Sequence, residues 1–307
     1  MVIYYLSGGL GNQILQYAIG RGIASTRTEE MAYDASWYRM RKRKPHETLR
    51  LGEYQLRCEH ISQKKLFQVL GTLLPEEGWK GPKWLYTAGM MHLYLYVDRI
   101  FHRRLWRGKR EFDISKTGLK GLPAPNDELP GIVLYGCPFH AEYFHHIAGE
   151  LREEFVPKRI DTEIMQMAKA MGENAVCIHV RVRDDGSIPD PAYYERAISQ
   201  MQKRMENPHF YVFSNNADHA KKLLHLPENA IFVKPGDAVQ DLYLMSQCHH
   251  HIIAESTYSW CGAWLGEKAG QIVMYPKGWE FEGLPLRLTF DNWIPIEGMR
   301  YMAVTDK

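Results

Sequence analysis

The feature that most constrains this fold is a regular alternation of apolar runs and helical patterns through residues 175–275. The runs are rich in β-branched and aromatic residues, whereas the segments between them place apolar residues three and four positions apart, as a helix does. Strands are predicted at residues 175–180, 210–213, 231–233, 252–254 and 271–275, and helices at residues 192–205, 217–224, 241–248 and 258–267. Because parallel strands need helical crossovers, this half of the chain predicts a doubly wound α/β sheet.

The N-terminal segment predicts a further strand and helix, joined by a glycine-rich turn. Residues 2–6 form a β-rich apolar run, and apolar residues recur at helical spacing through residues 14–23. The turn between them reads SGGLGNQ, from Ser7 to Gln13. Glycine permits positive φ and close approach of a ligand, and the N-terminus of the following helix attracts anions. The turn therefore suits a diphosphate, and a tight turn capped by Asn12 is the alternative interpretation.

The length of 307 residues is sufficient for two domains of about 150 residues each. Further strands are predicted at residues 31–34 and 132–135, and a helix at residues 141–155. The sequence Val-Pro-Lys at residues 156–158 follows this helix, so we expect domains at residues 1–157 and 158–307. Hydrophobic residues make up 45% and charged residues 24% of the chain, as in ordinary folded proteins.

Cysteine usage and hydropathy predict a protein of a reducing compartment. The five cysteines are scattered and form no C-x-x-C pair, which indicates neither a disulfide framework nor a zinc site. Apolar runs stay well below the ~18 to 20 residues of a transmembrane helix, and the N-terminal run lacks the basic lead-in of a signal peptide. We therefore expect a cytoplasmic protein.

The charge distribution bears on the class of partner. A net charge of +2 gives no global attraction to nucleic acid, so we expect no nucleic-acid partner. Two segments are nevertheless strongly basic, at residues 39–44 and 102–110, and aromatic residues interleave with the second. A solvated face explains these runs, and contact with an anionic membrane surface or a carrier lipid is the alternative.

Polar side chains follow several predicted strands, at the edge of the sheet where doubly wound folds bind ligands. The first loop reads HVRVRDD, from His179 to Asp185. Its arginines suit phosphate oxygens, His179 can donate to them, and Asp184 or Asp185 can serve as an acceptor or a base. A solvated loop with local ion pairs is the alternative.

Two later loops repeat this arrangement. The sequence FSNNAD places Ser214 and Asn215 between a strand and a helix, where capping is the simpler explanation. The sequence IIAESTYSWCGAWL places Ser256 and Thr257 at the start of a helix, whose first N–H groups can donate hydrogen bonds to a phosphate. Together the loops predict transfer from a nucleotide-activated donor, because cationic side chains and helix dipoles stabilise a departing diphosphate.

The sequence does not indicate a metal cofactor. Asp184 and Asp185 are adjacent rather than spaced as a D-x-D pair, and we expect a metal-independent site without a cofactor. The run from His249 to His251 does not predict a metal site, since neighbours on a strand alternate between faces.

Several motifs together resemble glycosyltransferase family 11, the α-1,2-fucosyltransferases. They are SGGLGNQILQYAIGR, YGCPFHAEYF, HVRVRD, FSNN, DLYLMSQCHHHIIAESTYSWCGAWL and YPKGW, and the resemblance runs from residue 1 to about residue 279. It implies the GT-B fold, in which two Rossmann-like doubly wound domains face a cleft, here an N-terminal acceptor-side domain and a C-terminal donor domain. The implied reaction is inverting and metal-independent transfer of L-fucose from GDP-fucose to the 2-hydroxyl of a β-galactoside in a glycan.

The resemblance also implies roles for single residues. The family pattern H-x-R-R-G-D-Y falls on His179, Arg181 and Asp184, which become the expected catalytic set, and Arg181 is expected to hold the donor diphosphate. The residues expected to bind the donor are Gly9, Gly11, Asn12, Gln13, His179, Arg181, Ser214, Asn215, Ser256 and Thr257.

Some positions depart from the family pattern. This chain has Val182 where the family has an arginine, Arg183 in place of a glycine, Asp185 in place of a tyrosine, Glu255 in place of an asparagine and Cys261 in place of a tryptophan. A carboxylate at Glu255 repels a diphosphate unless it is protonated or paired. A single asparagine at position 215 accepts fewer hydrogen bonds from guanine than a carboxylate would. These departures leave two alternatives open, which are a relative using another nucleotide sugar and a catalytically degenerate glycan-binding relative.

The absence of an anchor and the two basic runs also suggest where the enzyme works. They fit an enzyme that builds surface polysaccharide on a lipid-linked acceptor at the inner face of a membrane. A freely soluble cytoplasmic enzyme is the alternative.

Overall fold

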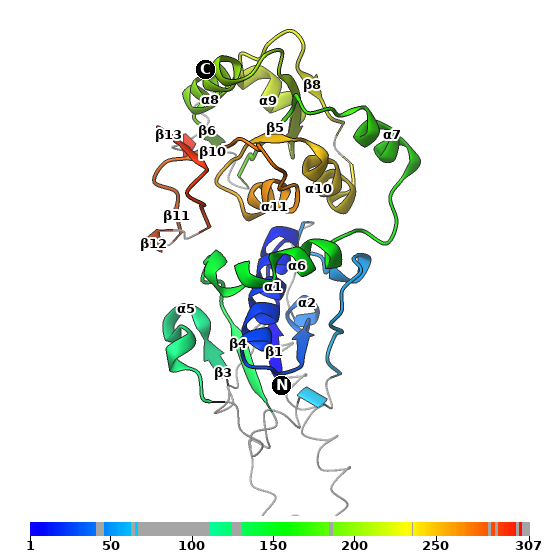
Figure 1. Ribbon diagram of the computed structural model, residues 1–307, viewed down its shortest axis with the longest axis vertical. Coiled ribbons are helices and arrows are strands. Elements are labelled where there is room, and N and C mark those ends of the chain that lie inside the picture. Colours follow the sequence, from blue (N-terminus) through cyan, green and yellow to red (C-terminus); the bar gives the residue numbers. More distant parts are fainter. Residues whose placement is uncertain are drawn as a thin grey trace, which may run out of the picture. The chain divides into compact units, whose positions relative to one another are not determined.

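The computed structural model describes residues 1–40, 46–62, 65–66, 111–124, 131–183, 187–234, 236–281, 284–285, 288–298 and 301–302. The chain forms two compact units, Met1–Glu154 and Phe155–Lys307, each built around a parallel sheet (Figure 1). This confirms the predicted α/β class. The division lies close to the boundary predicted at residue 157, and the donor and acceptor roles of the two domains stay predictions.

The sheet of the first unit has the strand order β2-β1-β4-β3, and every pair in it is parallel. Its strands are β1 (Val2–Tyr5), β2 (Met31–Asp34), β3 (Glu111–Asp113) and β4 (Ile132–Tyr135). Its helices are α1 (Leu10–Thr26), α2 (Trp37–Met40), α5 (Ile114–Thr117) and α6 (Ala148–Glu154), with 3-10 turns at Leu51–Glu53, Leu119–Gly121, Ala141–Tyr143 and His145–Ile147. The glycine-rich turn therefore joins β1 to α1, as predicted.

The helix predicted at residues 141–155 is shorter in the structure. Two 3-10 turns precede α6, because Phe144 leaves helical geometry with a φ of −136° and buries its ring. The backbone of Tyr143 passes so close to α1 that a Cβ added to Gly22 would lie 1.9 Å from the Tyr143 carbonyl oxygen. This close approach requires glycine at position 22.

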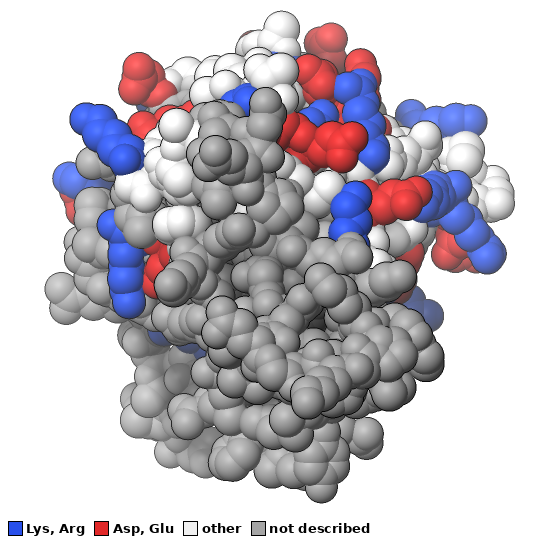
Figure 2. Space-filling model, turned by 90° about the horizontal axis from the view of Figure 1, so that it is seen from below, with Lys and Arg blue, Asp and Glu red and all other residues white. Residues whose placement is uncertain are grey.

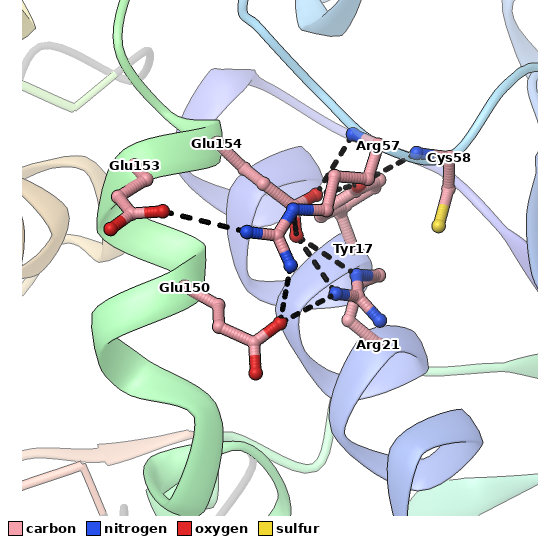
Figure 3. Close-up of polar contacts among 7 residues, drawn as sticks. All are labelled: Tyr17, Arg21, Arg57, Cys58, Glu150, Glu153 and Glu154. Atoms are coloured by element: carbon pink, nitrogen blue, oxygen red, sulfur yellow. Dashed lines mark hydrogen bonds and ion pairs between the residues drawn. The ribbon is translucent and has the colours of Figure 1, made fainter. Parts of the chain in front are cut away.

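A buried carboxylate fastens the end of α6 to α1 (Figure 3). Glu154 accepts hydrogen bonds from the Tyr17 hydroxyl, from Arg21 Nε at 3.0 Å and from the backbone N–H of Arg57 at 3.1 Å. The Arg57 guanidinium also contacts Glu150, with 2.6 Å between Nη1 and Oε2. The Glu154 side chain is only 1% exposed, so this network supplies the partners that a buried charge needs.

The sheet of the second unit has the strand order β13-β10-β9-β5-β7-β8, and these pairs are also parallel. Its strands are β5 (Ala175–Val180), β7 (His209–Ser214), β8 (Ile231–Phe232), β9 (His250–Ile252), β10 (Val273–Pro276) and β13 (Ile294–Ile296). Its helices are α7 (Thr162–Ala170), α8 (Pro191–Arg204), α9 (Ala217–Leu223), α10 (Ala238–Gln247) and α11 (Thr257–Leu265). Short strands β6 (Ile188–Pro189), β11 (Glu280–Phe281), β12 (Leu284–Pro285) and β14 (Tyr301–Met302) pair outside this sheet.

Helices cover both faces of this second sheet (Figure 1). Val176, Ile178 and Val180 of β5 pack in one core cluster with residues of α8 and α9. Ala175 and Cys177 pack in the other with residues of α7 and α10. Every residue of β5 is buried, which is why its sequence is apolar on both faces except at His179, rather than alternating between apolar and polar residues.

The connections of this sheet diverge between β5 and β9. The chain passes from β5 through α8 to β7 on one side, and from β9 through α11 to β10 on the other. The neighbouring strands β5 and β9 therefore form a topological switch point, and ligands in such sheets bind beyond the carboxyl ends of the strands there.

Candidate functional site

The residues predicted to bind the donor in the second unit lie in the loops after β5, β7 and β9. In the parallel pairing, Val180 lies beside Ser214, and Ile178 lies beside Ile252. These strands therefore end at one edge of the sheet, beyond the switch point. Arg181 follows β5 directly and is half-buried. The topology thus brings Arg181, Asn215 and Ser256 to the same edge, as their positions after the predicted strands had indicated.

Asn215 binds the main chain of the loop after β5. Its Oδ1 accepts from the Val182 backbone N–H at 2.9 Å, and its Nδ2 donates to the Val182 carbonyl oxygen, also at 2.9 Å. The side chain predicted to contact the donor therefore has a structural role, which is to hold the residue after Arg181. Asn216, next to it, caps α9 by accepting from the His219 N–H at 3.1 Å.

Two residues that depart from the family pattern contact each other at this edge. The Arg183 Nη2 atom lies 3.4 Å from Glu255 Oε2. The Glu255 side chain is 15% exposed and that of Arg183 is 49% exposed. Burial raises the pKa of Glu255, and the positive charge of Arg183 partly offsets that rise. The carboxylate that was expected to need a partner beside a phosphate site has one.

His179 is buried near the end of β5 and is 4% exposed. Burial lowers the pKa of its imidazole to about 3, and the charge of Arg181 adds a smaller contribution in the same direction. The ring is therefore neutral at pH 7 and can donate one N–H but adds no positive charge. Its Nδ1 atom has no hydrogen-bond partner among the described residues, and the ring centroid lies 5.6 Å from that of Tyr258 in the first turn of α11.

The N-terminus of α11 begins at the end of the loop after β9. Ser256 is the N-cap residue and extends no side-chain hydrogen bond to the helix, and Thr257 is its first helical residue. The Ser259 hydroxyl instead accepts from the Ala254 N–H at 3.0 Å, which ties the helix back to the loop. The helix terminus and an unpartnered, buried imidazole nitrogen thus lie close together at the switch point.

In the first unit, the glycine-rich turn is held by the side chains of Tyr38 and Gln13. Gly8 has a φ of +80°, and its carbonyl oxygen accepts from the Tyr38 hydroxyl at 2.8 Å and from Gln13 Nε2 at 3.2 Å. Gln13 also binds the main chain of Thr48 and Arg50, at 2.8 and 3.0 Å. Gln13 therefore shapes the turn, and its contact with a donor stays a prediction.

The other predicted residues of this turn lie at the start of α1. Gly9 is the N-cap of α1, and Gly11 and Asn12 are in the first turn of this helix. A Cβ added to Gly9 would meet only His46, at an ordinary distance of 3.6 Å. Among the described residues, nothing therefore requires glycine at position 9, in contrast to Gly8 with its positive φ.

Some predictions fall outside the described residues. They concern Asp184 and Asp185 as bases and the basic runs at residues 41–44 and 102–110. In the described ranges, no group of three or more His, Cys, Asp or Glu residues could hold a metal ion. None of the helices there combines the length and apolar character that crossing a membrane requires. On the face drawn in Figure 2, the coloured basic and acidic side chains are intermixed.

Sequence reasoning missed the residues that support these loops. Gln16 accepts from the Ser7 N–H at 2.9 Å and donates to the Ser7 hydroxyl at 3.2 Å. Tyr38 and Tyr258 likewise contact residues of predicted sites. The sequence pattern could have indicated Gln16, because it lies one helical turn after Asn12 on the apolar side of the helix. The structure shows that Gln16 is buried there.

Comparisons with known proteins show which family the chain belongs to. Glycosyl transferase family 11 matches residues 106–282. Alpha-1,2-colitosyltransferase of Escherichia coli is 26% identical over 97% of this chain and 99% of its own length. Galactoside 2-alpha-L-fucosyltransferase SEC1 of Bos taurus is 23% identical over 53% of this chain, and the match spans 49% of that protein.

A solved structure, that of NodZ alpha-1,6-fucosyltransferase soaked with GDP-fucose, has a TM-score of 0.45 at 16% identity. It covers 86% of this chain and 91% of the NodZ chain. The family match alone spans more than half of the sequence and includes the loops after β5, β7 and β9. The chain therefore belongs to glycosyl transferase family 11 and is a glycosyltransferase.

Proposed function

We propose that this enzyme transfers a deoxyhexose, L-fucose in the first instance, from its GDP-linked form to the 2-hydroxyl of a β-galactoside in a glycan. The observation that carries the proposal is the group at the switch point of the second sheet, where Arg181, the buried His179 and the N-terminus of α11 lie together. The names of two relatives, an alpha-1,2-colitosyltransferase and a galactoside 2-alpha-L-fucosyltransferase, support the sugar class and the linkage.

These groups suit a leaving diphosphate. Negative charge grows on the diphosphate as its bond to the sugar breaks, and donors already aimed at that position stabilise the transition state. The first N–H groups of α11 supply a partial positive charge, and Arg181 supplies a full one. The neutral His179 ring can contribute one N–H donor without the cost of burying a further charge.

Transfer with inversion needs a base that takes the proton of the acceptor hydroxyl. The candidates in the sequence are Asp184, Asp185 and Glu255, and we assign this role to Asp184, because it alone matches the family pattern. A positioned base contributes roughly 10² to 10⁴ in rate. Asp184→Asn should therefore lower kcat by at least a hundredfold with little change in donor affinity, and wild-type turnover in this variant would remove Asp184 from the mechanism.

A second donor is supported by the colitosyltransferase, whose match extends over nearly the whole of both chains. Colitose lacks the 3-hydroxyl group of fucose, so a site can accept both sugars or discriminate between them through that one group. Sites that hydrogen-bond a substrate hydroxyl reject the analogue that lacks it, whereas sites without such a contact discriminate weakly. The proposal therefore takes fucose as the first donor and colitose as the second candidate.

A panel of donors tests the proposal. Thermal shifts with GDP-fucose, GDP-colitose, GDP-mannose and UDP-galactose report binding, because a ligand of the folded state raises Tm by mass action. Turnover on a β-galactoside, with the linkage read by NMR, then identifies the reaction. We expect binding and turnover with GDP-fucose or GDP-colitose and an α-1,2 product. Binding of UDP-galactose alone, or binding of a glycan without any turnover, would contradict the proposal.

A further inference from the structure

The pair formed by Arg183 and Glu255 spans the switch point of the second sheet. Arg183 lies beyond the end of β5, Glu255 lies beyond the end of β9, and the two strands are neighbours. The residues are 72 positions apart in the sequence, and their side chains approach to 3.4 Å. Ser256, the N-cap of α11, directly follows Glu255.

The position of Glu255 is unfavourable for an anion site. A helix N-terminus attracts one negative charge, and a carboxylate one residue before the N-cap competes with a bound phosphate for the same field. Glu255 is 15% exposed, so water and salt screen its charge less than they would at an open surface. An unpaired carboxylate here would repel the diphosphate that the proposed function places at α11.

Arg183 supplies the missing counter-charge. Its guanidinium is half-exposed and contacts the carboxylate, and its backbone N–H donates to the Ser187 carbonyl oxygen at 3.0 Å. The backbone of the preceding residue, Val182, is held by Asn215. The main chain on which Arg183 stands is therefore fixed at two successive residues, which limits where its side chain can reach.

We propose that Arg183 is a positioning residue that acts through Glu255: it holds the carboxylate and cancels its charge, so that the N-terminus of α11 can accept a nucleoside diphosphate. Direct contact between Arg183 and the phosphates is not part of this role. The inference rests on the proposed function, since it presumes a diphosphate at this edge. Arg183 is then needed for diphosphate binding only while Glu255 is charged.

Calorimetric titration of GDP and guanosine into the full chain tests this dependence. Arg183→Gln should weaken GDP binding at least tenfold, because the carboxylate is left uncompensated, and should leave guanosine binding within twofold of wild type. Glu255→Gln should bind GDP at least as tightly as wild type. The double variant should return to within threefold of wild type, since the repelling charge is gone. Arg183→Lys, which keeps the charge, should also stay within threefold.

A matched control is Arg204→Gln, which removes one positive charge from the exposed end of α8, where the chain approaches the amino end of β7. It should bind GDP within twofold of wild type, and circular dichroism of all variants verifies that they are folded. If the double variant is as weak as Arg183→Gln, Arg183 contacts the phosphates itself and the inference is wrong. Equal weakening of guanosine and GDP in Arg183→Gln would overturn it as well, because charge would not be the cause.

The wild-type titration separates this inference from the proposed function. Failure of the wild-type protein to bind GDP overturns the proposed donor site and, with it, the role of Arg183. Tight GDP binding by wild type, together with unchanged binding by Arg183→Gln, overturns only the inference and leaves the proposed function standing.

Discussion

The Asn215 side chain brackets the main chain of Val182, accepting from its N–H and donating to its carbonyl oxygen, each over 2.9 Å. This bracket joins the loop after β7 to the loop after β5. Val182 directly follows Arg181, so the amide limits the freedom of the arginine that we expect to hold the donor diphosphate. A loop held in its binding geometry before the ligand arrives loses less entropy on binding.

Removing the bracket should therefore weaken donor binding. We expect Asn215→Ala to raise the donor KM about tenfold, with a smaller change in kcat, because the loop after β5 must then be ordered as the donor binds. Asn215→Asp should also weaken it, since a carboxylate cannot donate to the Val182 carbonyl. Asn216→Ala is the matched control, because it removes a cap of α9 and should lower Tm without raising KM. Equal KM values for both alanine variants would contradict this role.

Arg181 should be essential for turnover. We expect Arg181→Ala to lower kcat by about a hundredfold or more, on the order of 3 kcal/mol of lost stabilisation of the leaving group. Its circular dichroism spectrum should match that of wild type, because the side chain lies at a loop rather than in the core. Steady-state kinetics with Arg204→Ala as the control measures the effect, and a loss below threefold would show that the diphosphate is held elsewhere.

Turnover should not require a divalent metal ion. The proposed site stabilises the leaving diphosphate with Arg181 and the N-terminus of α11, which do the work that a metal does in other transferases. We expect full activity after dialysis against millimolar EDTA. Loss of activity that manganese or magnesium restores would disprove metal independence.

The buried histidines should make the protein less stable in acid. Burial lowers the pKa of both His179 and His251 to about 3, while an unfolded histidine has a pKa near 6.5. Between these values the unfolded chain binds a proton that the folded chain does not, so stability falls as pH falls through this window. The slope is about 1.4 kcal/mol per pH unit for each histidine.

The histidine contribution can be isolated by difference. Denaturant unfolding should be measured between pH 6 and pH 4. As the pH falls, the free energy of unfolding of His251→Gln should decrease less steeply than that of wild type, by about 1.4 kcal/mol per pH unit. Burial raises the pKa of Glu255 and of Asp241, which acts in the opposite direction, but these groups are common to both proteins. Parallel pH profiles for the two proteins would show that His251 titrates normally in the folded state.

Glu154 should contribute strongly to the stability of the first unit. It is the buried acceptor for Tyr17 and Arg21, so Glu154→Gln leaves Arg21 without its main counter-charge. Breaking such a pair typically costs about 3–5 kcal/mol. Glu153→Gln is the matched control on the same helix, since its side chain is 77% exposed and its pair with Arg57 should be worth less than about 1 kcal/mol. Similar unfolding midpoints for both variants would mean that Glu154 is not the anchor of α6.

Local patterns in the sequence determined the class of the fold and the edge of the second sheet that carries the candidate site. The strand at residues 175–180 and the strand at residues 132–135 were predicted with the bounds that the structure has, because each is a short apolar run with turn residues on both sides. Boundaries set by capping were harder to predict. Helix α10 begins before the predicted residue 241, because Asp237 accepts from the Val239 N–H and starts the helix there.

Contacts between distant parts of the chain were decided only by the tertiary structure. The sequence showed that Glu255 would need a partner beside a phosphate site, but that partner, Arg183, lies 72 residues earlier. Gln13 is predicted to lie at the donor, and the structure adds that its amide reaches the main chain 35 residues later. Periodicity and capping act over a few residues and leave a pattern in the sequence. Pairings of this kind depend on which strands become neighbours, and one sequence carries no local signal for that choice.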